Sequence, residues 1–123
     1  MKLLLVDDNE RIREVMKTLF SPVFDEVIEC EDGIDAVNSF DKNNPDWVVM
    51  DINLPTGKAG MKELDGIKAT EKIILSHPNA KVIIVSQYND ESTIDAAKNA
   101  GAIEFVSKEN LNKVIEVIKG ELN

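Results

Sequence analysis

The chain has 123 residues, of which 43% are hydrophobic and 30% charged, a composition that fits one globular domain with a single core. Its formal net charge of −9 argues against nucleic-acid binding, which requires a basic surface, and against attraction to anionic membranes. A single cysteine, Cys30, excludes an internal disulfide. No apolar run reaches the about 18 residues of a membrane span or forms a signal peptide, so we expect a cytoplasmic protein.

Short apolar runs alternate with helical periodicity along the chain. The apolar runs predict five strands, at Leu3–Val6, Glu26–Cys30, Trp47–Met50, Val82–Val85 and Ile103–Val106. Apolar residues at three- and four-residue spacing predict a helix after each strand, on Ile12, Val15, Met16 and Leu19; Ile34, Val37 and Phe40; Ile67, Ile73 and Ile74; Ile94, Ala97 and Ala100; and Leu111, Val114, Ile115 and Ile118. Asn9 is a good N-cap for the first helix, and Gly101 stands where a C-terminal glycine belongs after the fourth.

Five strand–helix units predict an α/β fold, a doubly wound parallel sheet with helices on both faces. The carboxyl ends of parallel strands meet at one edge of the sheet, where open α/β folds build their sites. Polar residues follow four of the predicted strands, namely Asp7 and Asp8, Asp51, Ser86 and Lys108. We therefore expect three carboxylates, a hydroxyl and an ammonium to converge at this edge.

This set of groups favours phosphoryl transfer. Three adjacent carboxylates repel one another, and a divalent cation with oxygen ligands, Mg²⁺ above all, relieves that repulsion. Phosphoryl transfer depends on positioning and charge neutralisation, and its nucleophile can be a carboxylate. Lys108 would bind the phosphate as a point charge, and the Ser86 hydroxyl could donate a hydrogen bond to it.

The order of these residues along the chain resembles the receiver domain of two-component response regulators. Further local matches are Val6-Asp7-Asp8-Asn9, Pro45-Asp46, Val49-Met50-Asp51, Leu54-Pro55, Asp65-Gly66, Ala100-Gly101-Ala102 and Phe105. The resemblance covers the whole chain and implies the flavodoxin-like (βα)5 fold with strand order 2-1-3-4-5. We expect one receiver domain over residues 1–123 and no output domain in the chain.

The resemblance also implies roles for the residues around the phosphate and the metal. Asp51 would accept a phosphoryl group from a histidine kinase or a phosphotransfer protein. Asp8 and Asp51 would ligate Mg²⁺ directly together with the backbone carbonyl of Asn53, and Asp7 would act through a bound water. Ser86 and Lys108 would hold the phosphoryl group.

Further implied roles concern switching and the lifetime of the phosphate. Phe105 takes the place of the family's aromatic switch, which turns inward as Ser86 moves toward the phosphate. The output surface would then be the fourth helix, fifth strand and fifth helix, which would contact a downstream protein. Asn53 and Tyr88 occupy the positions that tune hydrolysis of the phosphate. Such a domain is a signalling module and no enzyme, since it promotes only its own phosphorylation and dephosphorylation.

The chain departs from the family pattern in two places. Glu109 follows Lys108 where many receivers have a proline in a cis peptide bond, and a cis bond to a non-proline residue costs roughly 3 kcal/mol, so we expect a trans bond. Thr56–Glu63 puts eight residues where the family usually has one. This insertion is either a tolerated surface loop or a segment that contacts the phosphodonor partner or partly covers the phosphate.

Two alternatives stay open. A haloacid-dehalogenase-like phosphatase also uses an aspartyl phosphate with a serine or threonine, a lysine and an acidic pair. Those enzymes usually carry Asp-x-Asp where this chain has Asp51-Ile52-Asn53, their elements follow the inverse order, and a cap domain does not fit in 123 residues. The other alternative is a receiver that binds a partner without ever being phosphorylated.

Overall fold

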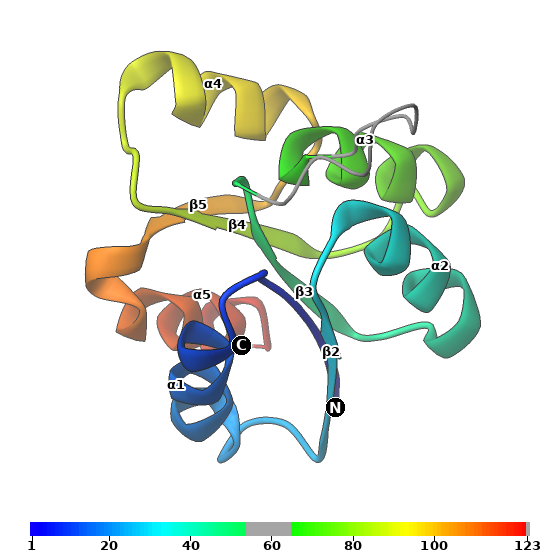
Figure 1. Ribbon diagram of the computed structural model, residues 1–123, viewed down its shortest axis with the longest axis vertical. Helices are drawn as coiled ribbons and strands as arrows, with labels where there is room; N and C mark the ends of the chain where they lie inside the picture. Colours follow the sequence, from blue (N-terminus) through cyan, green and yellow to red (C-terminus); the bar gives the residue numbers. More distant parts are fainter. Residues whose placement is uncertain (54–64, 123) are drawn as a thin grey trace.

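The computed structural model describes residues 1–53 and 65–122, which form one parallel sheet flanked by helices (Figure 1). The sheet has five strands in the order β2-β1-β3-β4-β5. The strands are β1 (Lys2–Val6), β2 (Glu26–Cys30), β3 (Trp47–Asp51), β4 (Val82–Ser86) and β5 (Glu104–Ser107). The helices are α1 (Glu10–Phe20), α2 (Gly33–Asn43), α3 (Gly66–Ser76), α4 (Glu91–Asn99), the short 3₁₀ helix η1 (Lys108–Asn110) and α5 (Asn112–Leu122). The doubly wound fold predicted from the sequence is confirmed.

Helices cover both faces of the sheet. Figure 1 shows α1 and α5 on one face and α2, α3 and α4 on the other. Along β1 the side chains alternate between these layers, since Leu3 and Leu5 pack with α1 and α5 whereas Leu4 and Val6 pack with α2, α3 and α4. All four are fully buried, which explains why the strand is a continuous apolar run rather than an alternating one.

The register of the central strands aligns the ends that carry the polar residues. β1 pairs with β3 so that Val6 lies beside Met50, and the next residues along the two strands are Asp7 and Asp51. Asp51 in turn lies beside Val85, one residue before Ser86. The carboxyl ends of β1, β3 and β4 therefore meet at one edge, as the sequence predicts.

Side-chain caps fix where the helices begin. The Asn9 side chain accepts hydrogen bonds from the backbone N–H groups of Arg11 and Ile12 at the start of α1, and aspartates cap α2, α3 and α4 in the same way. After α4, Gly101 has a φ of 107°, the left-handed conformation that glycine adopts without strain. These caps set the short connections between the helices and the strand ends.

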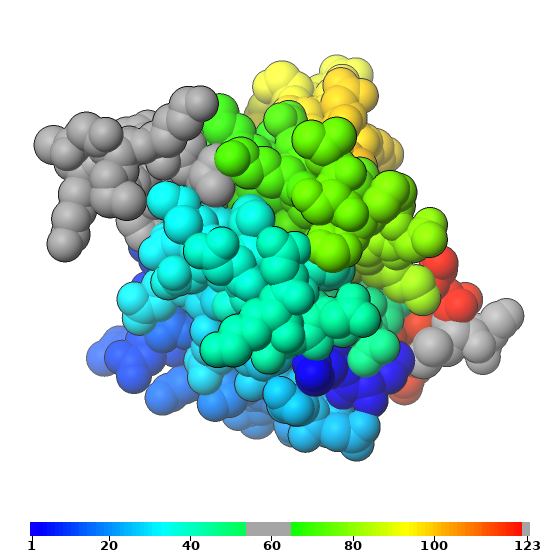
Figure 2. Space-filling model, turned by 90° about the vertical axis from the view of Figure 1, so that its right-hand side faces the viewer, coloured from blue at the N-terminus to red at the C-terminus, as the bar shows by residue number. Residues whose placement is uncertain are grey.

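On the face covered by α2 and α3, the two helices pack side by side over the sheet (Figure 2). His77, the C-cap of α3, reaches back to α2, where its Nε2 lies 2.7 Å from Asp41 Oδ1. Its ring also packs against Phe40, with 4.7 Å between the ring centroids. None of the helices in the described residues has the length and hydropathy that a bilayer crossing requires.

Two details of the sequence-based prediction are wrong. Val15 belongs to the apolar spacing that predicts the first helix, which would put it on the buried face, but it is 55% exposed because the buried stripe of α1 runs through Arg13, Met16 and Phe20 instead. The last strand begins one residue later than expected, at Glu104, which pairs with Ile83 of β4. The predicted trans bond after Lys108 is confirmed, since no cis peptide bond occurs in the described parts of the chain.

Candidate functional site

Three carboxylates meet where β1 and β3 end. Asp7 and Asp8 directly follow β1, and Asp51 is the last residue of β3. One carboxylate oxygen of each lies within 4.8 Å of the other two. Asp7 and Asp51 are almost completely buried, with exposures of 0% and 1%, while Asp8 is exposed. The structure thus brings together the acidic residues that the sequence placed at this edge.

Lys108 brings a positive charge to the two buried carboxylates. It follows β5 as the first residue of η1, and its Nζ lies 3.1 Å from Asp7 Oδ2 and 3.2 Å from Asp51 Oδ2. One ammonium faces three carboxylates, so the site keeps an excess of negative charge.

Burial and this excess of negative charge together shift the pKa values of Asp51 and Lys108. Burial, followed by repulsion from Asp7, raises the pKa of Asp51 above its ordinary value, and the attraction of Lys108 offsets this only in part. Burial acts to lower the pKa of Lys108, but the charges of Asp51 and Asp7 outweigh it and raise that pKa above its ordinary value. Lys108 therefore stays charged, while an ionised Asp51 is held in an unfavourable environment.

These residues fit a divalent cation. Asp7 Oδ2 is buried and has no hydrogen-bond partner among the described residues, although the Lys108 ammonium lies 3.1 Å from it as an ion pair. All three groups are hard oxygen donors, which Mg²⁺ prefers. A cation beside Asp7, Asp8 and Asp51 would balance the charge that Lys108 leaves uncompensated.

The remaining predicted site residues lie on neighbouring segments. Ser86, at the end of β4, is fully buried, and its Oγ accepts a hydrogen bond from the backbone N–H of Tyr88 at 3.0 Å. The backbone N–H of Asn53 donates to Asp51 Oδ1 at 3.3 Å, so the main chain of Asn53 lies beside the carboxylate cluster. Phe105 is half-buried and packs against the core layer of α2, α3 and α4. The insertion, residues 56–63, lies outside the described residues.

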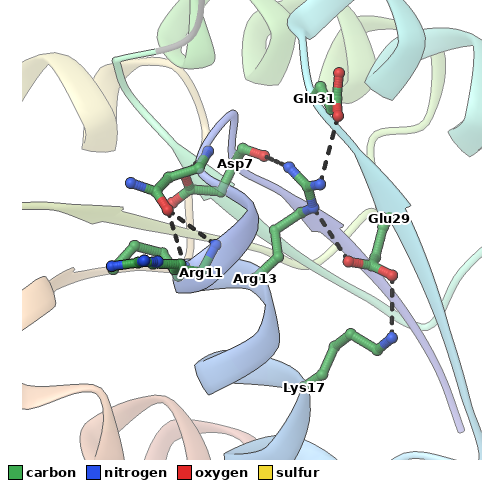
Figure 3. A network of polar contacts seen from close by, with 8 residues as sticks. Asp7, Arg11, Arg13, Lys17, Glu29 and Glu31 are labelled. Atoms are coloured by element: carbon green, nitrogen blue, oxygen red, sulfur yellow. Dashed lines mark hydrogen bonds and ion pairs between the residues drawn. The ribbon is translucent and has the colours of Figure 1, made fainter.

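One buried residue next to the site was missed by the sequence analysis. The Nη1 of Arg13 donates a hydrogen bond of 2.6 Å to the backbone oxygen of Asp7, and its Nε lies 3.1 Å from Glu29 Oε1 (Figure 3). The signal for it was its spacing, because Arg13 stands three residues before Met16 and seven before Phe20, at core positions of α1.

Comparisons with known proteins agree on one family. A family model, the response regulator receiver domain, matches residues 3–119. The chemotaxis protein CheY of Listeria monocytogenes is 33% identical over 121 residues, covering 97% of this chain and 96% of that protein. The transcriptional regulatory protein DegU of Brevibacillus brevis is also 33% identical over 121 residues, which cover 96% of this chain but 48% of DegU, so the chain spans about half the length of that relative.

Solved structures show the same architecture. The response regulator domain of Thermotoga maritima CheB superposes with a TM-score of 0.82 at 27% identity, and the match covers 98% of this chain and 94% of that domain. A CheY-like receiver domain protein of Methanospirillum hungatei superposes with a TM-score of 0.84 at 24% identity, covering 98% and 92% of the two chains.

Proposed function

The chain belongs to the response regulator receiver family, and on this premise we propose that it accepts a phosphoryl group on Asp51 with Mg²⁺ bound beside it. The observation that carries this proposal is the environment of the Asp51 carboxylate. It is buried at the end of β3, with ligand atoms of Asp7 and Asp8 within 4.8 Å and the Lys108 ammonium at 3.2 Å. A carboxylate placed so can attack phosphorus while positive charge neutralises the phosphoryl oxygens.

Each neighbouring residue has a role in this transfer. Asp8, Asp51 and the backbone carbonyl of Asn53 would hold Mg²⁺ directly, and Asp7 would hold it through a water. When bound, the ion supplies positive charge beside the phosphoryl oxygens. Lys108, which forms ion pairs with Asp7 and Asp51 in the structure, would pair with the phosphoryl oxygens once Asp51 carries them. The Ser86 Oγ uses a lone pair for the Tyr88 N–H, so its own hydrogen is free to be donated to the phosphate.

The donor would be a histidine kinase or a phosphotransfer protein, and the phosphoryl group would pass from its histidine to Asp51. We propose α4, β5 and α5 as the output surface, with Ser86 and Phe105 as the switch. α4 is suited to this role because Ala97 is its one buried residue, so little apolar contact holds the helix in place. The domain limits, residues 1–123, and the cytoplasmic location stay predictions.

Two alternatives are less well supported. The family match over residues 3–119 gives no support to a haloacid-dehalogenase-like phosphatase. A receiver that works without phosphorylation does not need the buried carboxylates and the lysine that meet at the end of β3.

Phosphorylation is tested with a small phosphodonor such as acetyl phosphate. With Mg²⁺ the protein should gain one acid-stable, base-labile phosphoryl group by intact mass, and chelation of Mg²⁺ should prevent it. Asp51→Asn should abolish the modification, while Asp35→Asn, at an exposed aspartate in the first turn of α2, should not. Normal phosphorylation of Asp51→Asn would refute the assignment, and a wild type that stays unmodified would favour the phosphorylation-independent receiver.

A further inference from the structure

The backbone of the metal site is held by Arg13. Asp7 donates its N–H to the carbonyl of Cys30 at 3.1 Å, which is where the pairing of β1 with β2 ends. The carbonyl of Asp7 accepts instead from Arg13 Nη1 at 2.6 Å. From these contacts we propose that Arg13 is a positioning residue for Mg²⁺, because it orients the peptide that precedes Asp8 and thereby the Asp8 carboxylate. This inference rests on the proposed function, in which Asp8 is a direct ligand.

Asp8 stands between two peptide groups that are each held by one hydrogen bond. Arg13 holds the peptide before it through the carbonyl of Asp7. The peptide after it is held by the Asn9 N–H, which donates to Asp7 Oδ1 at 2.9 Å. The Asp8 side chain itself is exposed, so its surroundings constrain it little and the two flanking peptides decide where it lies. Loss of either hydrogen bond would allow one of the two peptide groups that flank Asp8 to move.

The guanidinium is fixed on its other side by β2. Figure 3 shows it between the Asp7 carbonyl and two glutamates, with Nε 3.1 Å from Glu29 Oε1 and Nη2 3.4 Å from Glu31 Oε1. Glu29 is held in turn by Lys17, whose Nζ lies 3.1 Å from its Oε2. Arg13 is only 7% exposed. A planar group bonded at three of its nitrogens has little freedom to move. It therefore holds the Asp7 carbonyl at a fixed position relative to the edge of the sheet.

Charge and position predict opposite effects on metal binding. Arg13 is a cation near a proposed cation site, so if it acted by charge alone, its removal would tighten Mg²⁺ binding. If it acts by position, its removal weakens binding. Outer hydrogen bonds that orient metal ligands usually contribute about 10- to 100-fold to metal affinity, and one bond to the backbone should lie near the lower end of that range.

The test measures the Mg²⁺ dissociation constant by titration of amide resonances, without a phosphodonor. Only the resonances of the folded protein are followed, so a change in stability does not affect the measured constant. We expect Arg13→Met to weaken Mg²⁺ binding about tenfold. Lys17→Met is the matched control, since it removes the same charge from the same helix and a bond to Glu29 but no contact with Asp7. It should leave the affinity unchanged or slightly tighter. Wild-type or tighter binding by Arg13→Met overturns the proposal.

A second variant keeps the charge and changes only the geometry. A lysine ammonium cannot hold Glu29, Glu31 and the Asp7 carbonyl at once, so Arg13→Lys should weaken Mg²⁺ binding several-fold. Wild-type affinity in Arg13→Lys overturns the proposal, and this holds even if Arg13→Met does not fold.

Combination with Asp8→Ala separates this inference from the proposed function. Asp8→Ala should weaken binding, and adding Arg13→Met to it should have no further effect, because the ligand that Arg13 positions is gone. If the two changes weaken binding independently, Arg13 does not act through Asp8, although the magnesium site stands. If Asp8→Ala alone binds Mg²⁺ like the wild type, the proposed ligand set is wrong and the inference fails with it.

Discussion

Gly66, the first residue of α3, lies against the backbone of Asp51 with no room for a side chain between them. Its N–H donates to the carbonyl of Ile52 at 3.1 Å. A Cβ on Gly66 would overlap the carbonyl oxygen of Asp51 and come within 2.8 Å of the carbonyl carbon of Asp51 and the Cα of Ile52. These are backbone atoms that cannot rotate away. The missing side chain at Gly66 therefore lets α3 begin directly beside the proposed phosphoacceptor.

Gly66→Ala should push the end of β3 away from α3. We expect the free energy of unfolding to fall by about 1–3 kcal/mol, as for other overpacked sites, and Mg²⁺ binding to weaken because Asp51 is displaced. Gly120→Ala in α5 is the control, since nothing lies within 4 Å of its Cβ, and it should stabilise the helix by about 0.5–1 kcal/mol. Urea unfolding of the two variants measures both changes in the free energy of unfolding, and a Mg²⁺ titration of Gly66→Ala measures the change in metal binding. Equal stability of Gly66→Ala and the wild type would contradict the close approach.

The fold was predictable because its central strands are buried on both faces. β3 and β4 are buried along their whole length, and so they appear in the sequence as continuous apolar runs. The order of the strands came from the family resemblance and not from the runs themselves. The error at Val15 arose because an arginine in a helical sequence is normally expected to face solvent. The buried stripe of α1 passes through Arg13, so its orientation could not be read from the apolar residues alone. The partners that allow Arg13 to be buried, Glu29 and Glu31, lie 16 and 18 residues away on another element.

The convergence of Asp7, Asp51 and Lys108 was predictable for a similar reason, since strand ends meet at one edge of a parallel sheet. Contacts that depend on the local path of a loop were not predictable. The hydrogen bond from the Tyr88 N–H to Ser86 Oγ is of this kind. The roles assigned to these residues in metal and phosphate binding stay predictions.

Neutralising Asp51 should stabilise the metal-free protein at neutral pH. Burial and the charge of Asp7 raise the pKa of Asp51 in the folded state, so the folded protein binds this proton more tightly than the unfolded chain. Stability therefore falls as the pH rises from the ordinary aspartate pKa through the raised one, and it stays reduced at pH 7. In urea unfolding with a chelator, Asp51→Asn should be more stable than the wild type at pH 7, with a difference that shrinks toward about pH 4.

Adding Mg²⁺ provides a check on this comparison of Asp51→Asn with the wild type. In the proposed site Mg²⁺ binds the wild-type carboxylate of Asp51, so adding Mg²⁺ should reduce the difference in stability between the two proteins at pH 7. An Asp51→Asn variant that is less stable than the wild type at pH 7 without metal would show that the pair with Lys108 outweighs the burial of the charge.

Asp8→Ala should remove the stabilisation that Mg²⁺ gives to the folded protein. A ligand that binds only the folded state stabilises it by RT ln(1 + [L]/Kd), so the wild type should melt at a higher temperature with Mg²⁺ than without. Without metal, Asp8→Ala should melt slightly higher than the wild type, because one of three adjacent carboxylates is gone. Glu10→Ala, at an exposed acid in the first turn of α1, should keep the wild-type response. A wild-type response to Mg²⁺ in Asp8→Ala would argue against its role as a ligand.

The Tyr88 ring should lengthen the life of the phosphorylated state. The bond from the Tyr88 N–H to Ser86 Oγ holds this residue beside the proposed phosphate-binding hydroxyl, and its side chain is 55% exposed, so the ring is free to lean over the phosphate and obstruct water. Tyr88→Ala should therefore shorten the half-life several-fold, while Tyr88→Phe, which keeps the ring, should not. Decay of radiolabelled phosphate after removal of the donor gives both rates. If Tyr88→Ala decays as slowly as the wild type or more slowly, the ring does not shield the phosphate, and the water must approach along a path that residue 88 leaves open.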